Sequence, residues 1–300
     1  MKRINIDEIG PRDGFQNVDV FIPTEIKLRI IDGIVASNIN RIQLTSFVSP
    51  RAIPQMKDAA EVATACLKKY PEKKFYALVP NLHGAENAAQ CGLKEVSAVI
   101  SVSESHNIAN VRKTLAESFN QLKEMVATFP KVHIILDAAT AFGCPVEGVT
   151  SYDKLKSYMQ RAQDLGIDTS TVCDTIGIAH PNQVKEYFNR LQEDFPMMTF
   201  RTHIHDTRNM GMINTLTAIE CGITDVELSI GGLGGCPFAE GASGNTSTED
   251  FVYMLHELGY ETGVDFDKLL ETAKFVKEHV PGDFSGHHIN HPCKSPASRR

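Results

Sequence analysis

Short runs rich in β-branched and apolar residues recur along most of the chain, roughly every 25 to 40 residues, and each precedes a longer segment with helical apolar spacing. This alternation is typical of repeated βα units around a parallel sheet. The predicted strands lie near residues 3–8, 41–46, 74–79, 95–101, 132–137, 168–173, 199–204 and 225–230. The predicted connecting helices lie near residues 23–36, 57–69, 82–91, 107–128, 151–165, 181–194 and 209–222.

Eight βα units favour an α/β fold closed into a TIM (β/α)8 barrel, which commonly needs roughly 250 residues. An open doubly wound sheet has the same pattern, because periodicity does not reveal closure. The segments 246–258 and 265–279 are predicted to be additional C-terminal helices, and no low-complexity linker divides the chain. We therefore expect a single catalytic domain over residues 1–280. Residues 281–300 lack a clear apolar period and are predicted to be a flexible tail.

The composition narrows the classes of partner. The 300 residues are 42% hydrophobic and carry 37 acidic against 30 basic side chains, so the formal charge of −7 provides no general attraction to nucleic acid or anionic membranes. No apolar run approaches the length of a membrane span. The seven cysteines are odd in number and lack the paired spacing of a disulfide framework or zinc ribbon. We expect a soluble protein of the reducing cytoplasm that acts on a small molecule.

Two histidines end the seventh predicted strand. Strand alternation points His203 and His205 to the same side of the sheet, where two imidazoles can share one metal ion. The alternative is one buried, hydrogen-bonded histidine and one exposed histidine at a strand end. Arg12 and Asp13 follow the first predicted strand, so a carboxylate and a guanidinium lie at another strand end.

Strands one, seven and eight are neighbours in a closed barrel. Asp13, His203, His205 and the amide oxygen of Asn245 would then form a mixed nitrogen and oxygen site with positions left for water or substrate. Such a site suits Mg²⁺ or Mn²⁺ better than a structural zinc. A second metal site at the tail histidines His287, His288 and His291 has less support, since no carboxylate is expected nearby.

The loop 231–245 contains six glycines, which permit positive φ angles and close backbone approach. It can behave as a mobile lid or be an ordinary long turn, and it fails as a dinucleotide fingerprint because no helix begins inside it. Cys236 is the unusual residue of the loop. Its thiol could reach a bound ligand or pack as a small apolar group.

Several longer motifs follow one another in a specific order. They are Gly-Pro-Arg-Asp-Gly-Phe-Gln-Asn at 10–17, Thr-Ser-Phe-Val-Ser-Pro at 45–50, Pro-Gln-Met at 54–56, Phe-Gly-Cys-Pro at 142–145, Asp-Thr-Ile-Gly at 174–177, His-Ile-His-Asp-Thr at 203–207 and the loop 231–245. With these motifs the chain resembles, over about residues 3 to 280, the 3-hydroxy-3-methylglutaryl-CoA lyases. These enzymes belong to the metal-dependent carbon–carbon lyases and synthases built on a TIM barrel.

The resemblance implies a retro-aldol cleavage of a tertiary 3-hydroxyacyl-CoA to acetyl-CoA and a keto acid such as acetoacetate, as in leucine degradation, by a homodimer. It implies that Asp13, His203, His205 and Asn245 hold a divalent cation, that Arg12 contacts the thioester carbonyl and that Cys236 lies on a catalytic loop. Deprotonation of the C3 hydroxyl by His203 or Asp13 would start the cleavage, and Cys236 is a candidate proton donor to the enolate carbon. Charge on the enolate oxygen would be stabilised by Arg12.

The sequence departs from the lyase pattern near the acyl end of the substrate. Gln43 stands where a glutamate is usual, Ile135 replaces the arginine that binds the substrate carboxylate, and Arg208 replaces a tyrosine. Arg208 could supply the missing carboxylate contact. The predicted substrate-binding residues are Arg12, Gln16, Gln43 and Arg208, and Glu8 is predicted to orient Arg12 through a salt bridge.

Three functions are therefore compatible with the sequence. The first is a lyase for 3-hydroxy-3-methylglutaryl-CoA or a near relative, such as citramalyl-CoA or a longer-branched 3-hydroxyglutaryl-CoA. The second is a Claisen-type synthase that joins acetyl-CoA to a 2-keto acid on the same barrel. The third is a catalytically silent barrel that binds acyl-CoA or metal. The combination of Arg12, Asp13, His203, His205 and Cys236 favours an enzyme, and the Gly-Gly-Cys-Pro loop favours the lyase.

Overall fold

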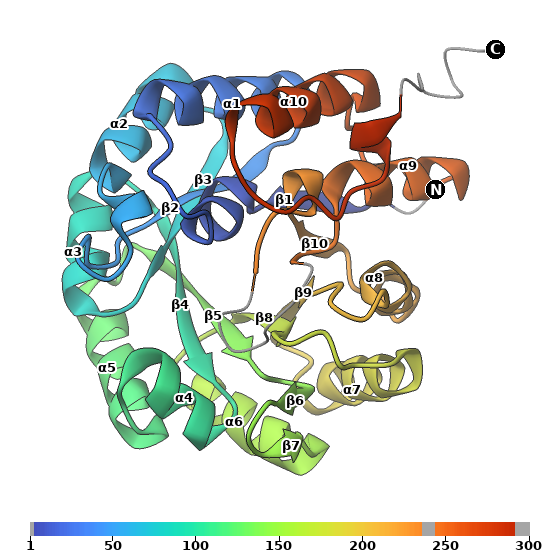
Figure 1. The fold of residues 1–300 in the computed structure, drawn as a ribbon. Helices are drawn as coiled ribbons and strands as arrows, with labels where there is room; N and C mark the ends of the chain where they lie inside the picture. Colours follow the sequence, from blue (N-terminus) through green and yellow to red (C-terminus); the bar gives the residue numbers. More distant parts are fainter. Residues whose placement is uncertain (1–2, 236–243, 292–300) are drawn as a thin grey trace.

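A computed structural model describes residues 3–235 and 244–291. Eight parallel strands close into a barrel in the order β1, β10, β9, β8, β5, β4, β3, β2, with helices around the outside (Figure 1). Closure confirms the predicted TIM barrel and excludes the open sheet. All eight predicted strands are present, as β1 (Asn5–Glu8), β2 (Arg41–Ser46), β3 (Lys74–Val79), β4 (Glu95–Ser101), β5 (His133–Ala139), β8 (Thr169–Asp174), β9 (Thr199–Ile204) and β10 (Asp225–Leu228).

Most of the outer helices bury an apolar stripe against the barrel. In α6 (Tyr152–Asp164), Leu155, Tyr158, Met159 and Ala162 recur at helical spacing and are buried, and Ser151 caps the first turn. The other helices are α1 (Thr24–Ala36), α2 (Ala59–Lys69), α3 (Leu82–Gln90), α4 (Glu104–Val111), α5 (Leu115–Thr128), α7 (Pro181–Asp194), α8 (Gly211–Glu220), α9 (Thr248–Glu257) and α10 (Phe266–His279). None in the described part of the chain is long and apolar enough to cross a bilayer.

The helix predicted over residues 107–128 is two helices. The helical conformation ends between α4 and α5, where Arg112 adopts a left-handed conformation with φ of 58°. Thr114 then starts α5 with a capping box in which its hydroxyl and the Glu117 carboxylate satisfy each other's backbone N–H groups. Apolar spacing continues through the break, so periodicity alone merged the two elements. The two-stranded hairpin of β6 (Gly143–Cys144) and β7 (Gly148–Val149) was also missed, because its strands are too short to show alternation.

Charged side chains fill the barrel interior at the N-terminal ends of the strands. Arg41 Nε donates to Asp7 Oδ2 at 2.8 Å, and Arg201 Nη1 approaches the same oxygen at 3.4 Å. Ile9, Tyr76 and Ile135 form a small, fully buried apolar cluster separate from the main core. These buried side chains fill the barrel interior below the C-terminal strand ends, where the active sites of such barrels lie.

The C-terminal segment packs against α9 and α10. The backbone N–H groups of His287 and His288 donate to the Asp250 carboxylate at 2.7 and 2.9 Å, and Ile289 is buried. The expectation that these tail histidines lack a nearby carboxylate is therefore wrong. Among the described residues, they do not join a cluster of three potential metal ligands. The division into residues 1–280 and a flexible tail stays a prediction.

Candidate active site

Asp13 lies on a tight turn that follows β1, at Gly10–Gly14. Glu8 fixes this turn, since its carboxylate accepts hydrogen bonds from Gly10 N at 2.8 Å, Ile230 N at 2.9 Å and Thr248 Oγ1 at 2.6 Å. The predicted salt bridge between Glu8 and Arg12 is wrong. Glu8 instead ties the loop after β1 to the loop after β10, and burial raises the pKa of its carboxyl to about 7.

His203 and His205 face the barrel interior from β9, with ring centroids 5.2 Å apart. They are 7% and 6% exposed, which contradicts the alternative of one exposed histidine. Nδ1 of His203 lies 3.0 Å from Glu227 Oε2, and its Nε2 lies 2.8 Å from Asn245 Oδ1. The strand alternation thus placed both rings correctly. Glu227 orients the His203 ring from the neighbouring strand β10.

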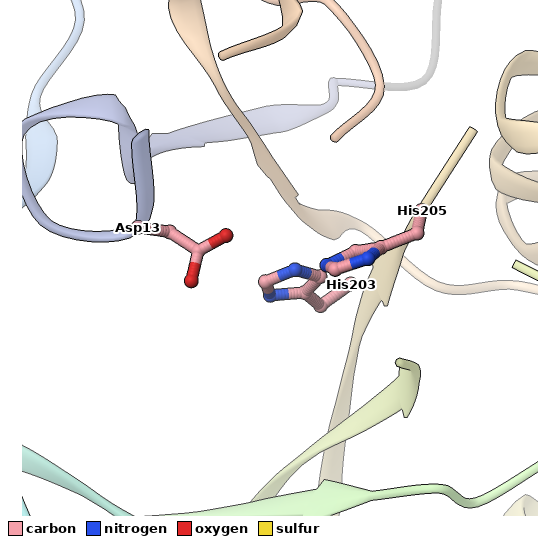
Figure 2. Close-up of side chains that lie close together, drawn as sticks. All are labelled: Asp13, His203 and His205. Atoms are coloured by element: carbon pink, nitrogen blue, oxygen red, sulfur yellow. The ribbon is translucent and has the colours of Figure 1, made fainter. Parts of the chain in front are cut away.

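Asp13 completes a group of three potential metal ligands. One ligand atom each from Asp13, His203 and His205 lies within 4.8 Å of the other two, and the carboxylate points toward the rings (Figure 2). Ligand atoms at about 2.1 Å from one ion are separated by about 3 to 4.2 Å, so small side-chain shifts would bring all three onto a single ion. His205 Nδ1 has no hydrogen-bond partner among the described side chains and backbone. The geometry therefore suits a shared cation.

The protonation states of Asp13 and His205 also suit metal binding. Burial disfavours the charged Asp13, but Arg12 and the two histidines outweigh it and lower the pKa of Asp13 to about 2. Burial and the neighbouring His203 lower the pKa of His205 to about 4. Burial also opposes charge on His203, yet Glu227 raises its pKa. At neutral pH Asp13 is anionic and His205 is neutral, as metal ligands must be.

Arg12 and Gln43 meet beside this group. Arg12 Nη1 donates to Asp13 Oδ1, and its Nε donates to Gln43 Oε1. Gln43 Nε2 in turn donates to Ser97 Oγ at 2.9 Å, and Gln16 Nε2 lies 3.5 Å from Asp13 Oδ1. Three of the four predicted substrate-binding residues therefore converge at the mouth of the barrel.

Arg208, the fourth of these residues, lies on the loop after β9 and is exposed. Its Nη1 donates to the carbonyl oxygens of Ile176 at 2.8 Å and Gly177 at 3.2 Å, on the loop after β8. These contacts direct Arg208 along the rim of the barrel. Ile135, which stands where the lyases have an arginine, is fully buried beneath the site with Ile9 and Tyr76. Its apolar side chain cannot bind a substrate carboxylate.

Asn245 links the glycine-rich loop to the potential ligands. Its Nδ2 donates to Asp13 Oδ2 at 2.6 Å and to Leu233 O at 3.0 Å, while its Oδ1 faces His203. A Cβ on Gly234, whose φ is 147°, would clash with this amide, so the close approach requires glycine. The predicted catalytic residue Cys236 lies outside the described residues.

A family model described as HMGL-like matches residues 3–276 of the chain. The chain belongs to the HMGL-like family. The hydroxymethylglutaryl-CoA lyase YngG of Bacillus subtilis is 39% identical over 279 residues, which cover 92% of this chain and 93% of that protein. The mitochondrial hydroxymethylglutaryl-CoA lyase of Mus musculus is 38% identical over 277 residues, with 92% and 85% covered.

A solved structure of an HMG-CoA lyase from Acinetobacter baumannii, in complex with coenzyme A and 3-methylmalate, has the same fold. It superposes with a TM-score of 0.92 at 35% identity and covers 98% of this chain and 96% of that one. The predicted family, fold and enzyme class, a carbon–carbon lyase, are confirmed.

Two buried carboxylates of this HMGL-like site were missed from the sequence. Glu227 on β10 accepts from His203, from Tyr76 at 3.1 Å and from Thr171 at 3.3 Å. Asp137 on β5 is 5% exposed and interacts with Arg12 and Glu227. Each stands alone among apolar neighbours in a strand, and a carboxylate is rarely fully buried without a partner. A single carboxylate among apolar strand residues was therefore the sequence signal that could have identified Glu227 and Asp137.

Proposed function

We propose that this protein is a divalent-metal-dependent lyase that cleaves 3-hydroxy-3-methylglutaryl-CoA, or a near relative such as citramalyl-CoA, to acetyl-CoA and a keto acid such as acetoacetate. The main support for this proposal is that Asp13, His203 and His205 lie together beside Arg12 at the mouth of an HMGL-like barrel. The names of the relatives support cleavage over condensation and over a silent barrel. Mg²⁺ and Mn²⁺ are the proposed cations.

The charges around Arg12 support a cation at this position. Asp13, Asp137 and Glu227 all act on the Arg12 guanidinium, so three carboxylates share one arginine. Burial and the Glu227 carboxylate raise the pKa of Asp137 to about 7, although Arg12 opposes the rise. The carboxylates around this arginine therefore outnumber it, which leaves a shortage of positive charge. Two further positive charges held by Asp13, His203 and His205 would correct that shortage, and Asn245 Oδ1 is the proposed additional ligand.

The reaction needs a proton removed, a carbon–carbon bond broken and an enolate protonated. A divalent cation bound by Asp13, His203 and His205 would lower the pKa of the substrate's C3 hydroxyl. His203 or Asp13 is the proposed base for that proton. When the C2–C3 bond breaks, its electron pair moves toward the thioester, and Arg12 stabilises the charge on the carbonyl oxygen with a charge-assisted hydrogen bond. Protonation of C2 then completes acetyl-CoA, with Cys236 as the proposed donor.

The remaining roles concern binding and cellular context. Gln16, Gln43 and Arg208 are the proposed substrate-binding partners of Arg12. A homodimer is proposed from the family resemblance, and a cytoplasmic location from the odd number of cysteines without paired spacing. Leucine degradation is the pathway in which such an activity would act.

The proposal is tested with purified protein, Mg²⁺ or Mn²⁺, and a small panel of 3-hydroxyacyl-CoAs, followed by mass detection of acetyl-CoA. The controls are chelator-treated protein and Asp13→Asn, which retains the shape of the side chain but loses its charge. We expect acetyl-CoA from at least one substrate, and only with metal and Asp13. Consumption of acetyl-CoA with a 2-keto acid would instead identify a synthase. Binding of acyl-CoA without turnover would identify a silent barrel.

A further inference from the structure

Asp137 has no assigned role in the mechanism above. It lies on β5 at the position paired with Val99 and Thr171 in the neighbouring strands, and it faces the barrel interior. Its Oδ1 is buried and has no hydrogen-bond partner among the described residues. A buried acceptor without a donor costs roughly 1 to 3 kcal/mol, more for a charged group. Such an oxygen is able to accept a hydrogen bond from a donor that moves toward it.

Arg12 and His203 both lower the pKa of Asp137, and the His203 ring is held by Glu227. The Arg12 guanidinium is paired with Asp13, while its Nε donates to the neutral Gln43. Asp13 is also one of the three residues that can hold a metal ion. An ion at that position would take up the negative charge of Asp13 and leave Arg12 without its present counter-charge.

Two carboxylates besides Asp13 act on Arg12, and only one of them is free to receive it. Glu227 already accepts from His203, Tyr76 and Thr171. Asp137, by contrast, has an oxygen with no partner.

We infer that Asp137 is a positioning residue, which takes over from Asp13 as the counter-charge of Arg12 when a metal ion binds to Asp13. Gln43 holds Arg12 Nε throughout, and Asp137 receives the terminal nitrogen that Asp13 releases. The guanidinium then stays inside the barrel mouth and faces the thioester carbonyl. This inference rests on the proposed function, and it assigns Asp137 no contact with the substrate.

The transfer links metal binding to the position of Arg12. If Asp137 cannot receive the guanidinium, Arg12 stays on Asp13 and competes with the metal for the same carboxylate. By thermodynamic linkage, neutralising Asp137 must then weaken metal binding through Arg12. A carboxylate that acted only by its general negative field would weaken metal binding whether or not Arg12 is present.

A double-mutant cycle on Mn²⁺ affinity separates these two cases. Free Mn²⁺ is measured by electron paramagnetic resonance with the full chain and with Asp137→Asn, Arg12→Gln and the double variant. We expect Asp137→Asn to raise the Mn²⁺ dissociation constant roughly tenfold in the wild-type background, within the range for residues that support metal ligands, and to raise it far less in the Arg12→Gln background. Equal factors in the two backgrounds would overturn the inference.

Asp7→Asn is the matched control for this cycle. It neutralises another fully buried carboxylate of the barrel interior, but Asp7 pairs with Arg41 and Arg201 at the opposite end. We expect Asp7→Asn to leave the Mn²⁺ affinity unchanged. Circular dichroism and melting temperature report folding for every variant. Asp137→Ser is the second neutral variant if Asp137→Asn does not fold.

A rescue experiment gives an independent readout. We expect Asp137→Asn to lower kcat roughly 10- to 100-fold with KM changed less than about threefold, because Arg12 is displaced while other substrate contacts remain. Gln43→Glu in the same protein returns a carboxylate to a side chain that already bonds Arg12 and should restore most of kcat. No restoration would contradict the inference. If the wild-type protein shows no lyase activity, the proposed function fails, and the Mn²⁺ cycle still decides the role of Asp137.

Discussion

Arg12 and Asp13 are adjacent in the sequence and form an ion pair with each other inside the mouth of the barrel. The same Asp13 carboxylate lies with His203 and His205 in the group that can hold a metal ion. Arg12 and a cation therefore compete for Asp13. If the proposed metal ion binds, the guanidinium would become available to a substrate carbonyl, so we expect metal binding and release of Arg12 from Asp13 to be one coupled event.

Removal of Arg12 should have opposite effects on metal binding and on catalysis. We expect Arg12→Gln to tighten Mn²⁺ binding about three- to tenfold, because Asp13 loses its competing partner, and to lower kcat by roughly 10² to 10³. Mn²⁺ titration and steady-state kinetics measure the two effects. The control is Arg190→Gln, at a half-buried arginine on α7 that pairs with Glu186, and it should change neither. Weaker Mn²⁺ binding in Arg12→Gln would contradict the competition.

Metal should stabilise the fold through His205. At a concentration of 100 times its dissociation constant, a ligand that binds only the folded state adds about 2.7 kcal/mol. We expect the free energy of unfolding in urea to rise by that amount with saturating Mn²⁺, to fall back after chelation, and not to respond to Mn²⁺ in His205→Ala. The matched control is His133→Ala at the opposite end of the barrel, where His133 contacts Glu95. Equal stabilisation of both variants would argue against His205 as a ligand.

Arg208 provides a test of how the acyl end is bound. If its guanidinium turns from the Ile176 and Gly177 carbonyls to a substrate carboxylate, Arg208→Ala should raise KM about tenfold for 3-hydroxy-3-methylglutaryl-CoA. The methyl ester of the same substrate lacks that charge and should be much less affected. Steady-state kinetics on both compounds measure the difference, with Arg190→Ala as the control. Unchanged kinetics for the acid would remove Arg208 from the site.

The raised pKa of the buried Glu249 carboxyl predicts how the stability of the protein changes with pH. Burial raises the pKa of this carboxyl from 4.5 to about 8, although Gly231 N donates to it at 2.9 Å. Between those values the folded protein holds a proton that the unfolded chain releases, so its contribution makes the protein less stable as pH rises from about 5 to 8. Glu249→Gln is neutral throughout and should gain roughly 3 to 5 kcal/mol relative to wild type over that range.

Urea unfolding at pH 5, 6.5 and 8 measures this gain. Glu257→Gln, at the exposed C-terminal end of α9, is the control and should follow the wild-type protein at every pH. A Glu249→Gln protein whose stability runs parallel to wild type across the range would show that the carboxyl ionises normally in the folded state.

Several features of the fold and the site could be predicted from the sequence because they depend on residues that lie close together in the chain. A strand or helix buries one face, so its apolar residues repeat with the period of that element, and all eight strands were found in this way. The same alternation placed His203 and His205 on one face. Where the local pattern was continuous, as across Arg112, the sequence did not show the break between α4 and α5.

The roles of Glu8, Asp137 and Glu227 depend on contacts between distant strands. Glu8 bonds Ile230 and Thr248, more than 200 residues away, so its partner could not be read from its position near Arg12. Asp137 and Glu227 occupy ordinary inward positions of their strands. Their meeting with Arg12 becomes visible only when the interior of the barrel is known.

The sequence by itself determined the order of the elements, the family and the common face of the two histidines, because these follow from local periodicity and from motifs of adjacent residues. Only the tertiary structure decided that β1 pairs with β10, which joins Glu8 to Leu228 and brings Asp13 to the histidines of β9. It also decided that Arg12 is shared among three carboxylates. The physical reason is that barrel closure and buried charge depend on distances through space, which the spacing of residues along a chain does not record.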